Sequence, residues 1–381
     1  FFISVIKVNK FKYFFPLICL SFLFRDIIGR YLPLGAYYFI GFVIIDLFLT
    51  LRKCSFRFHN ANLAWFNIYV IVLGVTGAFF LNPLVSVIGV INILLFLNYF
   101  HLKILVFRDD KIIENSVNIT LFIIVIGAYI NFFVSPDIFG LLNEHIYSSE
   151  ENLSKDNFTK RAVSFIRSPQ TLGLILAIMV LLRSRRSIEG KLISALVFTA
   201  GMLTFSKSFF VTLLGFFIYQ YKKLSLVAIP VALVGIGFID VNKLPSSFQR
   251  ILNFKNILAG FDSSKRMESY SEFFTFENLT IILFGNGVGT LSRGAEILAE
   301  KSDKFYSSES FFLQLYSEIG ITGLGLFLLL IWKMIGKTRK RGVFSIILLV
   351  SAFTPSLYGF GAAFFFYYFL FKNYSYEKAR V

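Results

Sequence analysis

The sequence predicts an all-α membrane protein that crosses the bilayer many times. Of its 381 residues, 56% are hydrophobic and 16% are charged, and the mean hydropathy is +0.71. An ordinary soluble domain carries about 25% charged residues, and a water-soluble fold of this length has no core large enough to bury so many apolar side chains. A spanning helix needs about 20 residues, so roughly a dozen spans account for most of the chain.

The apolar segments follow one another with short polar interruptions, and each interruption ends one predicted helix. The first segment follows Lys7, Lys10 and Lys12 without an A-x-A cleavage pattern, so we interpret it as a retained span. Residues 191–221 must hold two helices, which predicts a short, tilted or partly broken hairpin. We predict helices over 12–28, 34–51, 62–80, 84–102, 115–134, 168–183, 191–206, 208–221, 224–240, 309–332, 343–358 and 360–372.

The basic residues indicate which side of the membrane each connection occupies. Most of the 38 Lys and Arg fall in connections that share one side with both termini, which the positive-inside rule assigns to the cytoplasm. The net charge of +16 is therefore explained by topology, and no nucleic-acid partner is expected. We predict one membrane domain over 1–381, with two outer loops at about 135–167 and 241–308. The predicted cytoplasmic connections carry Arg52, Lys103, Arg183, Lys222 and Lys340, among others.

Four other cations lie at or beside predicted outer helix ends: Arg161, Arg167, Lys207 and Arg266. A cation near hydrocarbon is costly unless it is paired or hydrated, so these residues are functional candidates. The two cysteines and three histidines show no metal-ligand spacing, and no metal or cofactor is expected.

The first motif, RAVSFIRSPQTLG at 161–173, closes the first outer loop and opens a helix. Pro169 suits a first helical turn, and Ser168 is a suitable cap. The helix start would point N–H groups and its positive dipole end outward beside Arg161 and Arg167, a combination typical of an anion site. The alternative is a helix cap flanked by arginines that reach toward the membrane surface.

The second motif, LTFSKSFF at 203–210, places Lys207 inside a long apolar stretch. Lys207 either marks the turn of a hairpin or, because so short a hairpin would keep its tip below the outer surface, binds a counter-anion.

The second outer loop contains two further features. Residues 262–274 are predicted to form an amphipathic helix that lies on the membrane, with Arg266 facing the site. The GNGVG run at 285–289 has no βαβ unit around it, which favours a tight turn over a dinucleotide site. A less favoured interpretation is that its N–H groups bind phosphate.

The segment 307–330 leads from this loop into a long span. Glu309 lies at its outer mouth, where a carboxylate either stabilises the helix N-terminus or, among cations, accepts a proton. Glu318 lies about two and a half turns deeper. Three glycines are expected to permit close helix packing: Gly320, Gly323 and Gly325.

Together these motifs resemble those of the bacterial O-antigen polymerase (Wzy-type) and O-antigen ligase superfamily of membrane glycosyltransferases. The resemblance covers roughly 160–330. The family's first pattern matches Arg161, Ser164, Pro169 and Gln170. Its Leu-Thr-x-Ser-Arg box matches Leu203, Thr204, Ser206 and, with lysine in place of arginine, Lys207. Its outer-loop arginine before Gly-x-Gly matches Arg266 before Gly285 and Gly287, and its Glu-x-Gly-x-x-Gly element matches Glu318, Gly320 and Gly323.

The resemblance implies a GT-C-like polymerase in the bacterial inner membrane. Its substrates would be oligosaccharide units on undecaprenyl pyrophosphate, joined at the periplasmic face. Arg161 and Arg266 would grip phosphate oxygens, Lys207 and Arg167 would add charge, and Glu309 would be the general base. Membrane lipid and a chain-length regulator protein would be its partners.

Two alternatives remain open. Ligase-type members of the superfamily usually carry His-Asn where this chain has Glu309-Ser310, which argues against a ligase. A lipid-linked oligosaccharide flippase also has about twelve spans and a basic interior. Transporters, however, usually show related halves and membrane-buried charges, whereas the charges here are predicted in outer loops.

Overall fold

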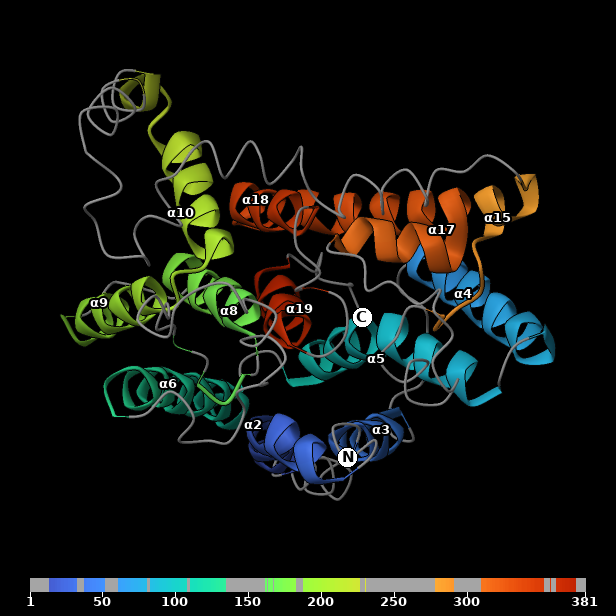
Figure 1. Cartoon of the computed structure of the whole chain (residues 1–381), viewed down its shortest axis with the longest axis horizontal. Helices are drawn as coiled ribbons and strands as arrows, with labels where there is room; N and C mark the ends of the chain where they lie inside the picture. The colour runs from blue at the N-terminus through green and yellow to red at the C-terminus, as the bar shows by residue number, and fades with distance from the viewer. Residues whose placement is uncertain are drawn as a thin grey trace, which may run out of the picture.

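The structure, a computed structural model, is almost entirely helical in the part of the chain that it describes (Figure 1). The described residues are 14–32, 38–51, 61–80, 83–107, 110–134, 162, 164–166, 168–182, 188–226, 230, 278–290, 310–352, 357 and 361–374. Among the described residues, four helices are long and apolar enough to cross a membrane, which supports an all-α membrane protein. These are α4 (Ala61–Phe80), α5 (Pro83–Phe107), α6 (Lys111–Phe133) and α17 (Phe311–Gly336).

The other described helices are each 17 residues or shorter. Most begin and end within a few residues of a predicted helix, but the short helix α15 was not predicted. The predicted helix at 224–240 and the amphipathic helix at 262–274 lie largely or wholly outside the described residues. The shorter helices are α2 (Phe15–Tyr31), α3 (Tyr38–Leu51), α8 (Pro169–Leu182), α9 (Ile188–Leu203), α10 (Lys207–Gln220), α15 (Leu279–Phe284), α18 (Arg341–Ser351) and α19 (Ala362–Asn373).

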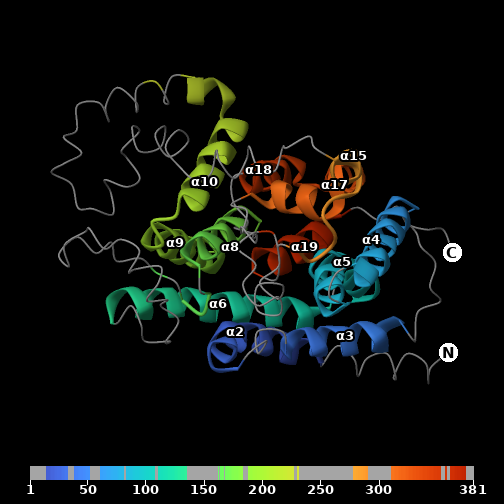
Figure 2. The same cartoon turned by 45° about the vertical axis from the view of Figure 1, so that its right-hand side comes forward.

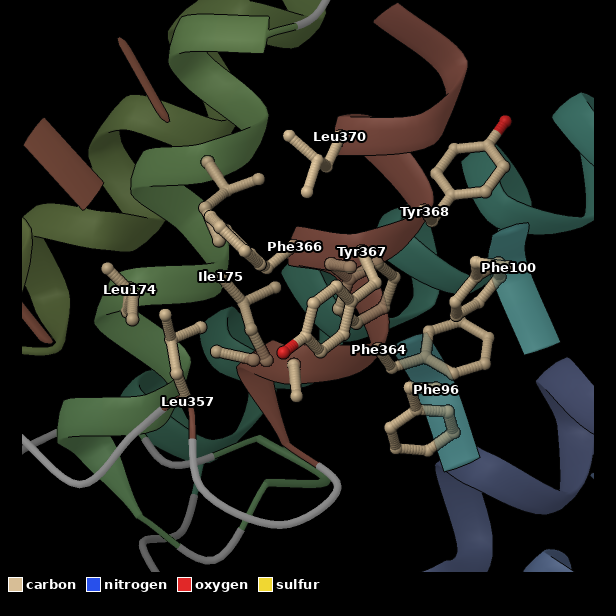
Figure 3. Close-up of a cluster of buried hydrophobic side chains, with 14 of the residues drawn as sticks. Phe96, Phe100, Leu174, Ile175, Leu357, Phe364, Phe366, Tyr367, Tyr368 and Leu370 are labelled. Carbon is tan, nitrogen blue, oxygen red and sulfur yellow. The ribbon is translucent and has the colours of Figure 1, made fainter. Parts of the chain in front are cut away.

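Helix α19 forms the centre of the molecule. Nearly all of its side chains are buried, as expected of a helix that is apolar on every face. Figure 3 shows its aromatic side chains between α8 on one side and α5 on the other. The Phe364 ring centre lies 4.8 Å from that of Phe22 and 4.9 Å from that of Phe100. These aromatic contacts join α2, α5 and α19 into one core.

One end of the molecule is held together by lysines at helix termini. Lys340 donates from Nζ to the carbonyl of Leu182 at 2.7 Å, at the C-terminus of α8, where a cation complements the helix dipole. Lys372, near the end of α19, forms a 2.9 Å ion pair with Glu114 in the first turn of α6. The sequence predicts that all of these helix ends lie on the cytoplasmic side. The contacts agree with that prediction, because they bring the same helix ends together.

Lys103 does not lie in a connection, and this part of the prediction was wrong. Helix α5 continues to Phe107, and Lys103 is 1% exposed inside it. Its Nζ lies 2.7 and 3.0 Å from the carboxylate oxygens of Asp46 on α3, and the Tyr99 hydroxyl donates to the same carboxylate at 2.7 Å. The prediction ended the helix at the charge because it did not foresee a buried partner that compensates for desolvation.

Helix α17 folds back on itself, so the predicted continuous span at 309–332 was also wrong. Gly320 has φ +66° and ψ −178°, a backbone conformation that is essentially restricted to glycine. The ring centres of Phe311 and Phe327 lie 5.6 Å apart, whereas sixteen residues of straight helix would separate them by roughly 24 Å. We call 311–319 the first arm and 321–336 the second arm.

Candidate functional site

Four of the five predicted site residues lie outside the described part of the chain: Arg161, Arg167, Arg266 and Glu309. Lys207 is described and exposed. The meeting of these side chains in one pocket therefore stays a prediction, and the site is built here from the residues next to them in sequence.

The described residues of the first two motifs lie together. The backbone N–H of Ala162 donates to the carbonyl of Leu203 at 3.0 Å. The Ser208 hydroxyl donates to the carbonyl of Gln170 at 2.8 Å, which joins the first turn of α10 to that of α8. A Cβ at Gly173 would lie 2.6 Å from the Cβ of Ser206, so the two segments are in close contact. Two motifs about forty residues apart thus form one structural unit.

A serine occupies the N-cap position of both helices of this unit, and the Ser168 side chain makes a capping hydrogen bond. The Ser168 hydroxyl accepts from the N–H of Thr171 at 3.4 Å, and Pro169 is the first helical residue, as predicted. Ser206 is the N-cap of α10, and Lys207 is the first residue of that helix. Lys207 therefore carries its positive charge at the start of a helix, where the dipole is also positive.

Backbone strain is concentrated in the same two motifs. Within the described ranges, Ser164 and Phe205 are the only residues other than glycine with positive φ, at 53° and 44°. Each costs on the order of 1–3 kcal/mol, and such strain gathers at functional sites. The Ser164 hydroxyl donates to the carbonyl of Ile124 at 2.7 Å, and Gly127 gives it room on α6. This packing holds the strained segment in place.

A third helix begins beside this unit. A Cβ at Gly361, the N-cap of α19, would lie 2.4 Å from the Cγ2 of Thr171 in the first turn of α8. Figures 1 and 2 both show α8 next to α9, α10 and α19. Each helix N-terminus carries roughly +0.5 of an elementary charge. Three helix starts and Lys207 thus make this end of the molecule suited to an anion.

The GNGVG run forms a tight turn after α15, as predicted. Gly285, Gly287 and Gly289 all have positive φ. A Cβ at Gly289 would lie 2.2 Å from the carbonyl oxygen of Val85, so the turn packs directly on the backbone of α5. The N–H of Asn286 donates to a carbonyl of α17 at 2.7 Å and is not available for a phosphate. The turn serves packing.

A tyrosine of α4 donates a hydrogen bond to a backbone carbonyl next to the fold in α17. The Tyr69 hydroxyl on α4 donates to the carbonyl of Ile319 at 2.9 Å. Gly323 makes room for the Tyr69 ring, because a Cβ there would lie 2.6 Å from Cε1 of that ring. Gly320 and Gly323 therefore permit close approach, as predicted. Gly325 does not, because nothing lies within 4 Å of a Cβ placed there.

The first arm of α17 buries a row of polar side chains. Ser310, Gln314, Ser317 and Glu318 are each at least 95% buried. At 100° per residue they share one side of the arm. In both views α15 and α17 lie across α19 from α8 and α9 (Figures 1 and 2). Glu318 contacts Gly285, the residue after α15, so it belongs to this pair of helices and not to the unit of α8 and α9.

Sequence reasoning did not single out two buried charged residues, Asp46 and Arg25, which are 0% and 7% exposed. In the sequence, the feature that could have identified them is a charged residue inside an apolar run. Across the described ranges, no three His, Cys, Asp or Glu side chains gather as a metal site would require.

No family model, curated protein or solved structure matches the chain. The resemblance to the O-antigen polymerase and ligase superfamily therefore stays a prediction from the sequence motifs.

Proposed function

We propose that the protein is a polysaccharide polymerase of a bacterial inner membrane. It joins oligosaccharide units, carried on undecaprenyl pyrophosphate, at the periplasmic face. We further propose about twelve spans, a GT-C-like fold and cytoplasmic termini. The observation that supports this proposal best is the close contact of the first turns of α8 and α10, which unites the two motifs at one anion-attracting end.

The proposed reaction transfers a growing glycan from one carrier to another. A hydroxyl oxygen of the acceptor sugar attacks the anomeric carbon of the donor, and the bond from that carbon to the pyrophosphate oxygen breaks. Glu309 takes the hydroxyl proton, and undecaprenyl pyrophosphate leaves.

Negative charge develops on the departing pyrophosphate. Oriented cations and dipoles in a site with little water stabilise such charge by several kcal/mol. Arg161 and Arg266 suit this role because a guanidinium binds two phosphate oxygens at once, while Lys207 and Arg167 add positive charge.

Deletion of the gene tests the function. The polymerase proposal expects single repeat units on the cell surface in place of long chains. In a strain that carries the gene back, Arg161→Ala or Arg266→Ala is expected to abolish long chains while the protein still inserts. Lys333→Ala, at the opposite end of the molecule, is the control and should restore the normal chain-length pattern. Normal chains with either arginine variant would contradict the roles of these residues.

One observation favours a flippase as a second candidate. A discontinuous helix with a buried carboxylate is typical of transporters, and α17 folds at Gly320 beside the fully buried Glu318. Loss of a flippase would leave no repeat units on the surface, and loss of a ligase would leave polymer on its carrier. The same deletion strain therefore separates all three functions.

A further inference from the structure

Arg25 is a buried cation near the middle of α2, in an otherwise apolar part of the core. Its side chain is 9% exposed, and Nε and Nη2 each donate to Asp26 at 2.9 Å. The guanidinium carbon lies 5.0 Å from the ring centre of Phe22 and 5.9 Å from that of Phe39. Among the residues that the structure describes, none forms a hydrogen bond with Nη1.

The geometry leaves one edge of the guanidinium buried but without a hydrogen-bond acceptor among the described residues. The group has five N–H donors and can present two parallel pairs of them to planar or tetrahedral oxyanions. Asp26 occupies the pair formed by Nε and Nη2, and the Phe22 and Phe39 rings restrict how the group can turn. A buried N–H without an acceptor costs about 1–3 kcal/mol. The buried Nη1 thus lacks an acceptor within the described core, and an oxyanion that reaches it would supply one.

The neighbours of Arg25 place it close to the unit formed by the first two motifs. The Phe22 ring stacks on that of Phe364, in the first turn of α19, at 4.8 Å. The ring of Phe24, the residue before Arg25, lies 6.5 Å from that of Phe165 in the first motif. Arg25 therefore lies on the part of α2 that faces the first motif and the start of α19.

We propose that Arg25 binds phosphate oxygens through its Nη1 edge, and that Asp26 orients it for this purpose. A tetrahedral oxyanion matches the fork geometry, and the nearby helix starts add positive potential. The phosphate comes either from the polyprenyl pyrophosphate of the donor or from a phospholipid headgroup. Its assignment to the donor rests on the proposed function. Arg25 is thus a binding residue contributed by the membrane helices, in addition to the loop arginines.

Binding of farnesyl pyrophosphate to the purified full chain tests this proposal. The protein is kept in dodecyl maltoside, which carries no phosphate, and Kd is measured by thermophoresis, with farnesol as the control for the apolar chain. Arg25→Gln is expected to raise the Kd by roughly tenfold or more, because charge-assisted hydrogen bonds are lost. Arg25→Lys is also expected to weaken binding, because lysine lacks the fork. Lys333→Gln, a cation at the opposite end, is the matched control and should leave the Kd unchanged.

The source of the phosphate is separated by adding phosphatidylglycerol. Competition that raises the apparent Kd of the wild type but not of Arg25→Gln identifies a headgroup site, and no competition identifies the donor site. An unchanged Kd in Arg25→Gln would overturn the proposal. If that variant does not fold, an unchanged Kd in Arg25→Lys overturns it instead. Wild-type protein that does not bind farnesyl pyrophosphate also overturns it, whereas the proposed function fails only if the deletion strain keeps its long chains.

Discussion

A charged side chain in the apolar core of this protein lowers the stability of the fold unless it is paired. The carboxylate of Asp46 accepts hydrogen bonds from Lys103 and Tyr99, and all three side chains are almost completely buried. In such a group the attraction between partners offsets desolvation only while every partner is present. The consequence is a strong dependence of stability on each member of the group.

Asp46→Ala is expected to destabilise the protein by about 3–5 kcal/mol, because it leaves the Lys103 ammonium buried without its carboxylate. The double variant Asp46→Ala/Lys103→Met should recover much of this loss, since no buried charge remains. Thermal unfolding in detergent measures both. A double variant that is no more stable than Asp46→Ala would show that charge compensation is not the cause.

Tyr69→Phe tests a single hydrogen bond. It leaves the Ile319 carbonyl without its hydroxyl donor, at an expected cost of about 1–3 kcal/mol. Tyr31→Phe is the control, because Tyr31 is 72% exposed. Equal melting temperatures for the two variants would mean that water or another group satisfies this carbonyl.

At the scale of elements, α17 shows what the sequence alone can and cannot predict. Its apolar run and its boundaries were predictable, and so was the close approach at Gly320 and Gly323. The fold at Gly320 was not, because a glycine in an apolar run is compatible with a straight helix. The backbone angles of Gly320 and the contact between Phe311 and Phe327 reveal the fold, and both depend on tertiary packing.

Two glycines of α17, one at the fold and one in the second arm, make a matched pair for this fold. Gly320→Ala is expected to prevent correct folding, because φ is +66° and a Cβ would lie 2.3 Å from the carbonyl oxygen of Leu283. Gly325→Ala should be neutral or slightly stabilising, because the site is open and alanine favours helix. Protein yield and monodispersity in size-exclusion chromatography distinguish the two. Well-folded Gly320→Ala would contradict the observed fold.

The candidate site, like α17, was predictable from the sequence only in part. The two motifs marked by Ser164 and Lys207 were recognisable from residue types and spacing, and the structure packs their segments together. The role of α19 in the same region was not predictable, since the residues around Gly361 carry no polar signal. Arg25 was not singled out, because the sequence does not show that its side chain points into the core.

At the scale of the whole molecule, the helices divide into two ends. The lysine contacts of Lys340 and Lys372 gather one set of helix ends, and the starts of α8, α10 and α19 gather at the other. The order of basic residues predicts that the lysine-rich end faces the cytoplasm.

Labelling of single cysteines in intact cells tests this orientation. With Cys19 and Cys54 replaced by serine, a membrane-impermeant maleimide should label Tyr31→Cys, at the end of α2, and not Arg341→Cys, at the start of α18. After the membrane is opened, both should react. The reverse pattern would invert the topology and place the candidate site in the cytoplasm.

The position of α19 along the chain also bears on how the protein is made. Because α19 fills the centre yet follows every other described helix, α5 and α8 are translated long before the segment that joins them. At about 5–20 residues per second, this leaves a partly built bundle without its central helix for tens of seconds. Ribosomes that stall before the codon for Ala362 would therefore release an incomplete bundle, which membrane proteases are expected to clear.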